Sequence, residues 1–159
     1  MLRPHFPTAA LRVRHAASYR VCCHYMPKHE TRLRVRYAET DQMGVVYHAN
    51  YLVWMEIGRV EYVRSCGFNY KDLETLEGIL LSVVDVQCRY LYPARYDDEI
   101  VVRTDMVRSN PRMVEFGYEI RHAEPDRLLA SGSTRHVWLN RNMRPSRLPD
   151  KYHEFLLRK

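Results

Sequence analysis

The feature that most restricts the fold of this chain is a single helical segment followed by four strands in succession. Residues 51–66 form an uninterrupted run between Asn50 and Gly67, and its first five residues are all apolar. A helix that is apolar on every side at its start must be surrounded by protein there. Four segments with strand character follow, at 79–92, 99–108, 114–121 and 128–139. One buried helix and a run of strands predict an α+β protein.

A further strand precedes the helix. In residues 31–38, Leu33, Val35 and Tyr37 alternate with arginines, which is the pattern of a half-buried strand. The order of strand, helix and four strands indicates an antiparallel sheet wrapped around one long central helix. So small a sheet leaves an edge and part of the helix uncovered, and dimerisation would cover both.

Charge is distributed unevenly along the 159 residues, whose net charge is +6. Residues 1–25 hold four arginines and no acid, so the remainder carries 21 basic and 19 acidic residues, a net charge of +2. This near balance, without an aromatic stacking platform, gives no reason to expect a nucleic-acid partner. Three interpretations fit the basic extension 1–25: a mitochondrial-type presequence, a disordered tail, or codons upstream of a start at Met26. We favour the last and treat 26–159 as a single domain.

The cysteines and the apolar segments indicate the cellular compartment in which the protein is expected. Cys22 and Cys23 are adjacent and no CxxC pair occurs, so a reduced, cytoplasmic protein is the simpler interpretation. The Cys22-Cys23-His24 cluster lacks a second ligand pair at suitable spacing, and we expect no metal site. No stretch approaches the ~20 apolar residues of a membrane span, so we expect a soluble protein without stable membrane insertion.

The segment between the first strand and the helix concentrates reactive groups. Asp41 follows the alternating strand directly, and Asn50, nine residues later, is placed to cap the helix. A helix N-terminus offers unpaired N–H groups and a positive dipole end that stabilise negative charge on a reacting carbonyl oxygen. A carboxylate held nearby can act as a nucleophile or as a general base on water. We therefore expect an active site here.

Residues 37–59 resemble the 4-hydroxybenzoyl-CoA thioesterase branch of the hotdog-fold thioesterases, which includes acyl-CoA thioesterases found beside the bacterial Tol-Pal system. The resemblance extends more weakly over roughly residues 30–150. It implies the hotdog fold, acyl-CoA hydrolysis without metal or cofactor, and homodimers or homotetramers with active sites between subunits. The matching residues are Tyr37, Thr40, Asp41, Gly44, Val45, Val46, Tyr47, His48, Asn50, Tyr51 and Glu56.

The resemblance assigns the catalytic carboxylate to Asp41, for which an Asx-turn is the alternative role. His48 matches a histidine implicated in catalysis in the Tol-Pal-associated members, through its side chain or its main-chain N–H; a turn residue is the alternative. Tyr37 suits orientation of the site through its hydroxyl, or core packing. The same resemblance places substrate binding at Gly44, Val46, Tyr47 and Asn50.

Arginines after the last strand are candidates for the phosphates of CoA, since guanidinium suits both a 3′-phosphate and a pyrophosphate. We assign this role to Arg144, with surface solvation as its alternative. On the helix, we expect Glu56 to pair with Arg59 rather than act as a second acid.

The expected function is hydrolysis of a short-chain or aromatic acyl-CoA. One alternative is a hotdog hydratase or dehydratase, but the sequence has none of the histidine-containing motifs of those enzymes. The other is a non-catalytic acyl-CoA sensor or binding module, against which the presence of Asp41 argues.

Overall fold

The computed structural model describes residues 28–153, so the basic extension 1–25 and the Cys22-Cys23-His24 cluster lie outside it. β1 (His29–Arg34) is followed by the one-turn helix η1 (Tyr37–Glu39) and by the long helix α1 (Asn50–Ser65). Two short helical segments come next, α2 (Tyr70–Asp72) and η2 (Leu73–Glu77). The remaining elements are β2 (Ile79–Tyr90), β3 (Glu99–Asn110), β4 (Met113–His122), β5 (Arg127–Asn140) and η3 (Asp150–Tyr152).

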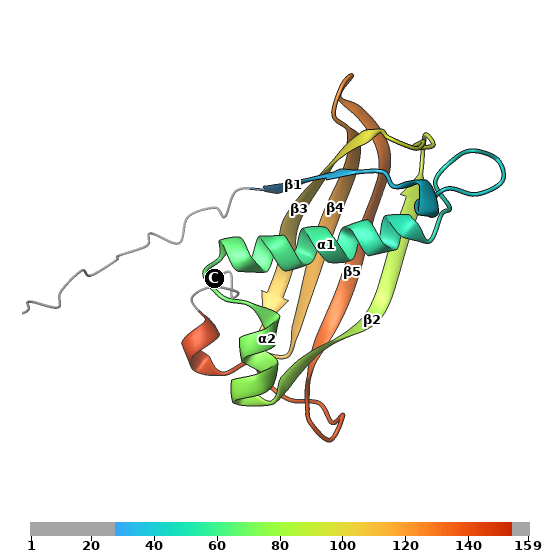
Figure 1. The fold of residues 1–159 in the computed structure, drawn as a ribbon. Coiled ribbons are helices and arrows are strands. Elements are labelled where there is room, and N and C mark those ends of the chain that lie inside the picture. Colours follow the sequence, from blue (N-terminus) through green and yellow to red (C-terminus); the bar gives the residue numbers. More distant parts are fainter. Residues whose placement is uncertain (1–27, 154–159) are drawn as a thin grey trace, which may run out of the picture.

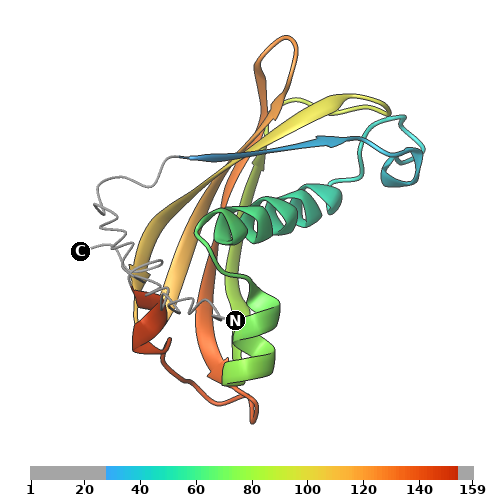
Figure 2. The same ribbon diagram turned by 60° about the vertical axis from the view of Figure 1, so that its left-hand side comes forward.

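The five strands form one antiparallel sheet in the order β1-β3-β4-β5-β2. Figure 1 shows α1 lying across one face of this sheet, and Figure 2 shows the sheet curving around the helix. This arrangement confirms the predicted α+β hotdog fold. The order leaves β1 and β2 at the two edges of the sheet, and the end of β2 approaches the start of α1 (Figure 1).

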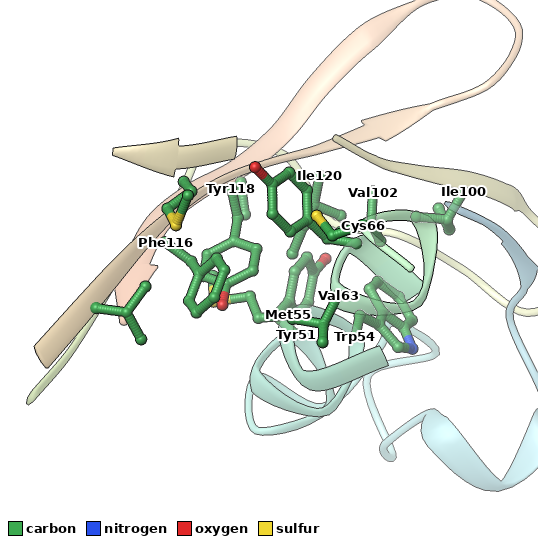
Figure 3. Close-up of a cluster of buried hydrophobic side chains, with 14 of the residues drawn as sticks. Tyr51, Trp54, Met55, Val63, Cys66, Ile100, Val102, Phe116, Tyr118 and Ile120 are labelled. Carbon is green, nitrogen blue, oxygen red and sulfur yellow. The ribbon is translucent and has the colours of Figure 1, made fainter. Parts of the chain in front are cut away.

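The core lies between α1 and the concave face of the sheet (Figure 3). Trp54, Met55 and Val63 of α1 are fully buried there. Burying each such side chain stabilises the fold by about 1.5–3 kcal/mol. The helix lies close to β3 at Gly58, where a Cβ atom would lie 2.5 Å from Thr104 Oγ1. Glycine is therefore needed at this crossing.

Two expectations about the first strand and the helix were wrong for the single chain. β1 ends at Arg34, because the Val35 N–H donates to the Asp98 carbonyl and the chain then turns through η1. Tyr37 consequently lies 78% exposed instead of in the core. The start of α1 is not enclosed either: Leu52 and Val53 are 38% and 42% exposed, because one sheet covers only one side of a helix.

The expected Glu56–Arg59 ion pair is also wrong. Glu56 is exposed, whereas Arg59 turns inward and places Nη1 3.0 Å from Nε2 of the fully buried His136. Burial and the Arg59 charge lower the pKa of His136 to about 3, so this imidazole is neutral.

The end of α1 and the two thiols complete the description of the fold. Gly67 follows the helix with φ 97°, a left-handed conformation that commonly ends a helix. Cys66 and Cys88 are free thiols. The last helical element within the described residues is η3. No helix in residues 28–153 has the length and apolar character needed to cross a membrane.

Candidate active site

The loop from Thr40 to Val46 places the candidate carboxylate. The Asp41 N–H donates to the Val45 carbonyl and the Gly44 N–H donates to the Asp41 carbonyl, both at 2.9 Å. Gly44 has φ 71°, a left-handed conformation that glycine adopts at little cost and that makes this turn tight. The Asp41 Oδ1 atom accepts the Met43 N–H at 2.8 Å, an Asx-turn that fixes the direction of the carboxylate.

A second acid, Glu39, anchors this loop to the core, although it was not among the residues expected at the site. Its side chain is 4% exposed and accepts hydrogen bonds from the Arg36 N–H, the Arg36 guanidinium and the Trp54 indole N–H. Burial raises the pKa of Glu39, but these hydrogen bonds and the Arg36 charge outweigh it, so the pKa lies below its ordinary value. The arginine three residues before this glutamate is the one sequence signal of the contact.

The backbone of Glu39 also connects the loop to the helix. Its carbonyl accepts the Tyr47 N–H at 2.9 Å and the Asn50 Nδ2 at 2.8 Å. Asn50 therefore does not cap α1 as predicted: Ala49 occupies the N-cap position, without a side-chain cap, and Asn50 is the first helical residue. The reason is that the Asn50 amide is already used to join the helix start to the loop.

The start of α1 has main-chain N–H groups that make no hydrogen bond within residues 28–153. The N–H groups of Asn50 and Tyr51 donate to the carbonyls of Tyr47 and His48, closing short turns. Within residues 28–153, the His48 N–H makes no hydrogen bond. The His48 carbonyl instead accepts the Tyr90 hydroxyl at 3.0 Å, which ties the helix start to the end of β2. Within the described residues the Ala49 N–H likewise makes no hydrogen bond, so two main-chain donors at the positive end of α1 are available.

A cavity of about 300 Å³ opens where the loop, the helix start and the end of β2 meet. Its lining joins the acid, the histidine and three tyrosine rings in one space. Partial burial and the neighbouring Cys88 thiol raise the pKa of Tyr90 to about 12, so its hydroxyl stays a donor at neutral pH. The lining residues are Asp41, Met43, Val45, Val46, His48, Tyr51, Tyr90, Leu91, Tyr92 and Pro93.

The eight residues expected at the site fall into three groups. Asp41, Val46 and His48 line the cavity directly. Three others belong to the same loop: Tyr47 packs its ring 4.3 Å from the His48 ring, and Gly44 and Asn50 hold the backbone in place.

Tyr37 and Arg144 lie elsewhere in the single chain. The Tyr37 ring packs against Tyr96 on the outside, with centroids 5.7 Å apart. Arg144 follows β5, where its N–H donates to the Asn140 side chain and Asn140 pairs with Ile79. It therefore lies beside the first residue of β2, whereas the cavity lies beside Tyr90, the last.

The arrangement suits attack on an electrophilic carbonyl carbon. The cavity is lined by a fixed carboxylate, by apolar side chains and by His48 at a helix start with unused main-chain N–H groups, which is the combination that acyl transfer requires. Residues 28–153 contain no group of three or more histidine, cysteine or acidic side chains placed to hold a metal ion.

Comparison with known proteins identifies related chains. A family profile described as Thioesterase superfamily matches residues 43–129. A Bacillus subtilis protein, provisionally named acyl-CoA thioesterase YneP, is 49% identical over 88 residues, which are 55% of this chain and 63% of that protein. The chain thus spans less than two thirds of that relative's length.

Two further relatives extend the likeness. The acyl-CoA thioester hydrolase YbgC of Escherichia coli O157:H7 is 34% identical over 92 residues, covering 58% of this chain and 68% of that protein. The crystal structure of a DHNA-CoA thioesterase from Staphylococcus aureus superposes with a TM-score of 0.78 at 33% identity, covering 82% of this chain and 89% of that one.

Proposed function

The chain belongs to the thioesterase superfamily, and from that membership we propose that it hydrolyses an acyl-CoA thioester to the free acid and CoA. The observation that carries the proposal is that the Asp41 carboxylate and His48, just before α1, line the same cavity. The relatives named acyl-CoA thioesterase and acyl-CoA thioester hydrolase support the substrate class.

In the proposed reaction, Asp41 acts on the thioester carbon. It either attacks directly, giving an acyl-aspartate anhydride that water cleaves, or removes a proton from the attacking water. In both routes the C–S bond breaks, the thiolate of CoA leaves and takes up a proton, and water supplies the new oxygen of the acid. The Asx-turn supports either role, because it points the carboxylate without adding a counter-charge.

We assign the main-chain N–H of His48 to the oxygen that becomes negative as the carbon is attacked. This N–H is unused within residues 28–153 and lies at the positive end of α1. The Tyr90 hydroxyl donates to the His48 carbonyl and so fixes the following peptide group, which carries the second unused N–H, that of Ala49. A direct role for the His48 imidazole, and one for Tyr37, remain predictions.

A short-chain or aromatic acyl group fits this cavity best. Its volume of about 300 Å³ lies at the lower end of the range of roughly 300–1,000 Å³ for small-molecule pockets. Tyr51, Tyr90 and Tyr92 contribute ring faces and edges. The likeness to a DHNA-CoA thioesterase agrees with an aromatic substrate.

We further propose that two chains pair through β2. This edge strand carries exposed Val83, Val84 and Val86 at 48%, 54% and 43%, an apolar edge of a kind that natural proteins cover. Antiparallel pairing about the middle of β2 sets the Ile79 end of one strand beside the Tyr90 end of the other. The partner subunit's Arg144 would then approach the cavity, so that Arg144 retains its predicted role in CoA binding.

The cytoplasmic location expected from the sequence also remains a prediction.

The test is release of free thiol from a panel of acyl-CoAs with short, long and aromatic acyl groups, with binding of each measured in parallel. We expect turnover, fastest with short or aromatic groups. Binding without turnover would instead support the sensor interpretation. Loss of acyl-CoA without thiol release would support a hydratase or dehydratase, and turnover of long chains alone would contradict the proposed acyl preference.

A further inference from the structure

Met55 lies on α1 one turn after Tyr51, whose side chain lines the cavity beside Asp41. Both residues are buried between the helix and the sheet (Figure 3). The Met55 side chain ends at β5, where its Cε atom lies 2.5 Å from the position that a Cβ atom of Gly132 would occupy. A Cβ atom there would also clash with the Gln87 carbonyl oxygen. Glycine is therefore required at this position, and the methionine fills the space beside it.

The contact between Met55 and Gly132 lies next to the inner wall of this cavity. Gly132 pairs with Cys88 of β2, two residues before Tyr90. Alternate residues of a strand share a face, so Cys88 and Tyr90 point to the same side of the sheet. Tyr90 lines the cavity, and its ring packs against the Tyr51 ring with centroids 5.2 Å apart. An acyl group that extends inward past these two tyrosines would therefore meet the Met55 side chain.

Beyond Met55 the interior becomes polar. Arg59 follows one turn later on α1, and its Nη1 atom lies 3.0 Å from His136 Nε2. The Thr134 hydroxyl lies 2.7 Å from the same nitrogen and 2.7 Å from the Tyr118 hydroxyl. These groups are unfavourable neighbours for an apolar chain, because covering a charge or a hydroxyl with hydrocarbon costs free energy. Met55 thus separates the cavity from a polar cluster in the core.

We propose that the Met55 side chain limits the length of the acyl group that the cavity accepts. The inference rests on the proposed function and identifies a residue that determines its specificity. Replacement by alanine removes the Cγ, Sδ and Cε atoms and lengthens the apolar space as far as Thr134. Chains longer than this space would contact the polar cluster of Thr134, His136 and Arg59. The gain should therefore be confined to a few methylenes.

The test compares kcat/KM of Met55→Ala and wild type on butanoyl-, octanoyl- and palmitoyl-CoA. Each methylene newly buried is equivalent to a factor of about four in binding. We therefore expect the octanoyl-to-butanoyl ratio to rise by about tenfold or more, with palmitoyl-CoA still a poor substrate. Met55→Leu keeps the side-chain volume and the fold but is one atom shorter, so it should raise the ratio by a smaller factor. Met106→Ala, at a fully buried methionine of β3, is the matched control and should leave the ratio unchanged.

Direct binding separates this inference from the proposed function. S-butyl-CoA and S-octyl-CoA are thioethers that cannot be hydrolysed, and calorimetric titration gives the affinity of each. The octyl-to-butyl affinity ratio should be about tenfold higher for Met55→Ala than for wild type, and unchanged for Met106→Ala. This result is expected even if no thioester is hydrolysed, in which case the proposed function alone would fail. The same ratio in wild type and in the folded Met55 variants, or an equal rise in Met106→Ala, would overturn the role assigned to Met55.

Discussion

Replacing Glu39 with glutamine should lower the free energy of unfolding by about 2 kcal/mol at pH 7. The carboxylate accepts the Arg36 N–H at 2.7 Å, the Arg36 guanidinium at 3.0 Å and the Trp54 indole N–H at 3.1 Å. Glutamine keeps one acceptor oxygen, which can serve Trp54, and turns its amide donors toward Arg36. The lost charge-assisted bond to a main-chain N–H costs about 1.5–3 kcal/mol. The Arg36 side chain is 72% exposed, so loss of its ion pair with residue 39 adds little.

The pH dependence identifies the carboxylate as the cause. Because the pKa of Glu39 lies below its ordinary value of 4.5, the stabilisation is fully present above pH 4.5 and is lost as the pH falls through the folded-state pKa. The gap between wild type and Glu39→Gln should therefore be constant from pH 7 to about pH 5.5 and narrow below 4.5.

Urea unfolding of both proteins at pH 7, 5.5 and 4 measures this gap, and at pH 7 the melting temperature should fall by about 4–8 °C. Glu56→Gln, an exposed acid on α1 that forms no ion pair within residues 28–153, is the matched control and should stay within about 0.5 kcal/mol of wild type. A Glu39→Gln variant as stable as wild type at pH 7, or a stability difference that does not change in acid, would show that the Glu39 carboxylate does not stabilise the fold in this way.

Three further predictions concern the core and the edge. Buried His136 has a pKa of about 3 against an ordinary 6.5. Below pH 6.5 the histidine of the unfolded chain therefore binds a proton, whereas that of the folded chain does not. Stability should therefore fall by up to about 1.4 kcal/mol per pH unit below 6.5 in urea titrations, and His136→Gln should remove this component; identical pH slopes would count against it. Gly58→Ala should destabilise by about 1–3 kcal/mol, since the new Cβ would lie 2.5 Å from Thr104 Oγ1; a higher melting temperature would contradict the close crossing of α1 and β3. Val84→Lys on β2 should yield monomers in sedimentation, whereas Val107→Lys, equally exposed on an inner strand, should not; a dimer that survives Val84→Lys would exclude pairing through this edge.

The order of the elements could be predicted because hydrophobic periodicity is local. The alternation of the strands and the apolar start of α1 can each be recognised from a few consecutive residues. The turn at Gly44 needs only one glycine at a left-handed position. The inward turn of Arg59 could not be predicted, because its partner His136 lies 77 residues away. The burial of Glu39 likewise depends on Trp54, which reaches the loop only once the helix has docked.

The same distinction holds at the site. The segment around Asp41 and His48 could be proposed as a site because the acid, the glycine, the histidine and the helix start are contiguous in sequence. Met55 and Gly132 belong to α1 and β5, and only the docking of the helix on the sheet brings them together. Tyr90 and Tyr92 also reach the lining of the cavity beside Asp41 only in the folded chain, where the Tyr90 hydroxyl donates to the His48 carbonyl.

We propose that the Asp41 carboxylate performs the chemistry, and kcat/KM of the Asp41→Asn variant tests this role. Asparagine keeps an oxygen for the Met43 N–H, so the loop should remain folded. On the best acyl-CoA of the panel, we expect kcat/KM to fall by roughly 10²-fold or more. Asp150→Asn, whose side chain is 99% exposed on η3, should match wild type. Equal hydrolysis by wild type and folded Asp41→Asn would contradict the account.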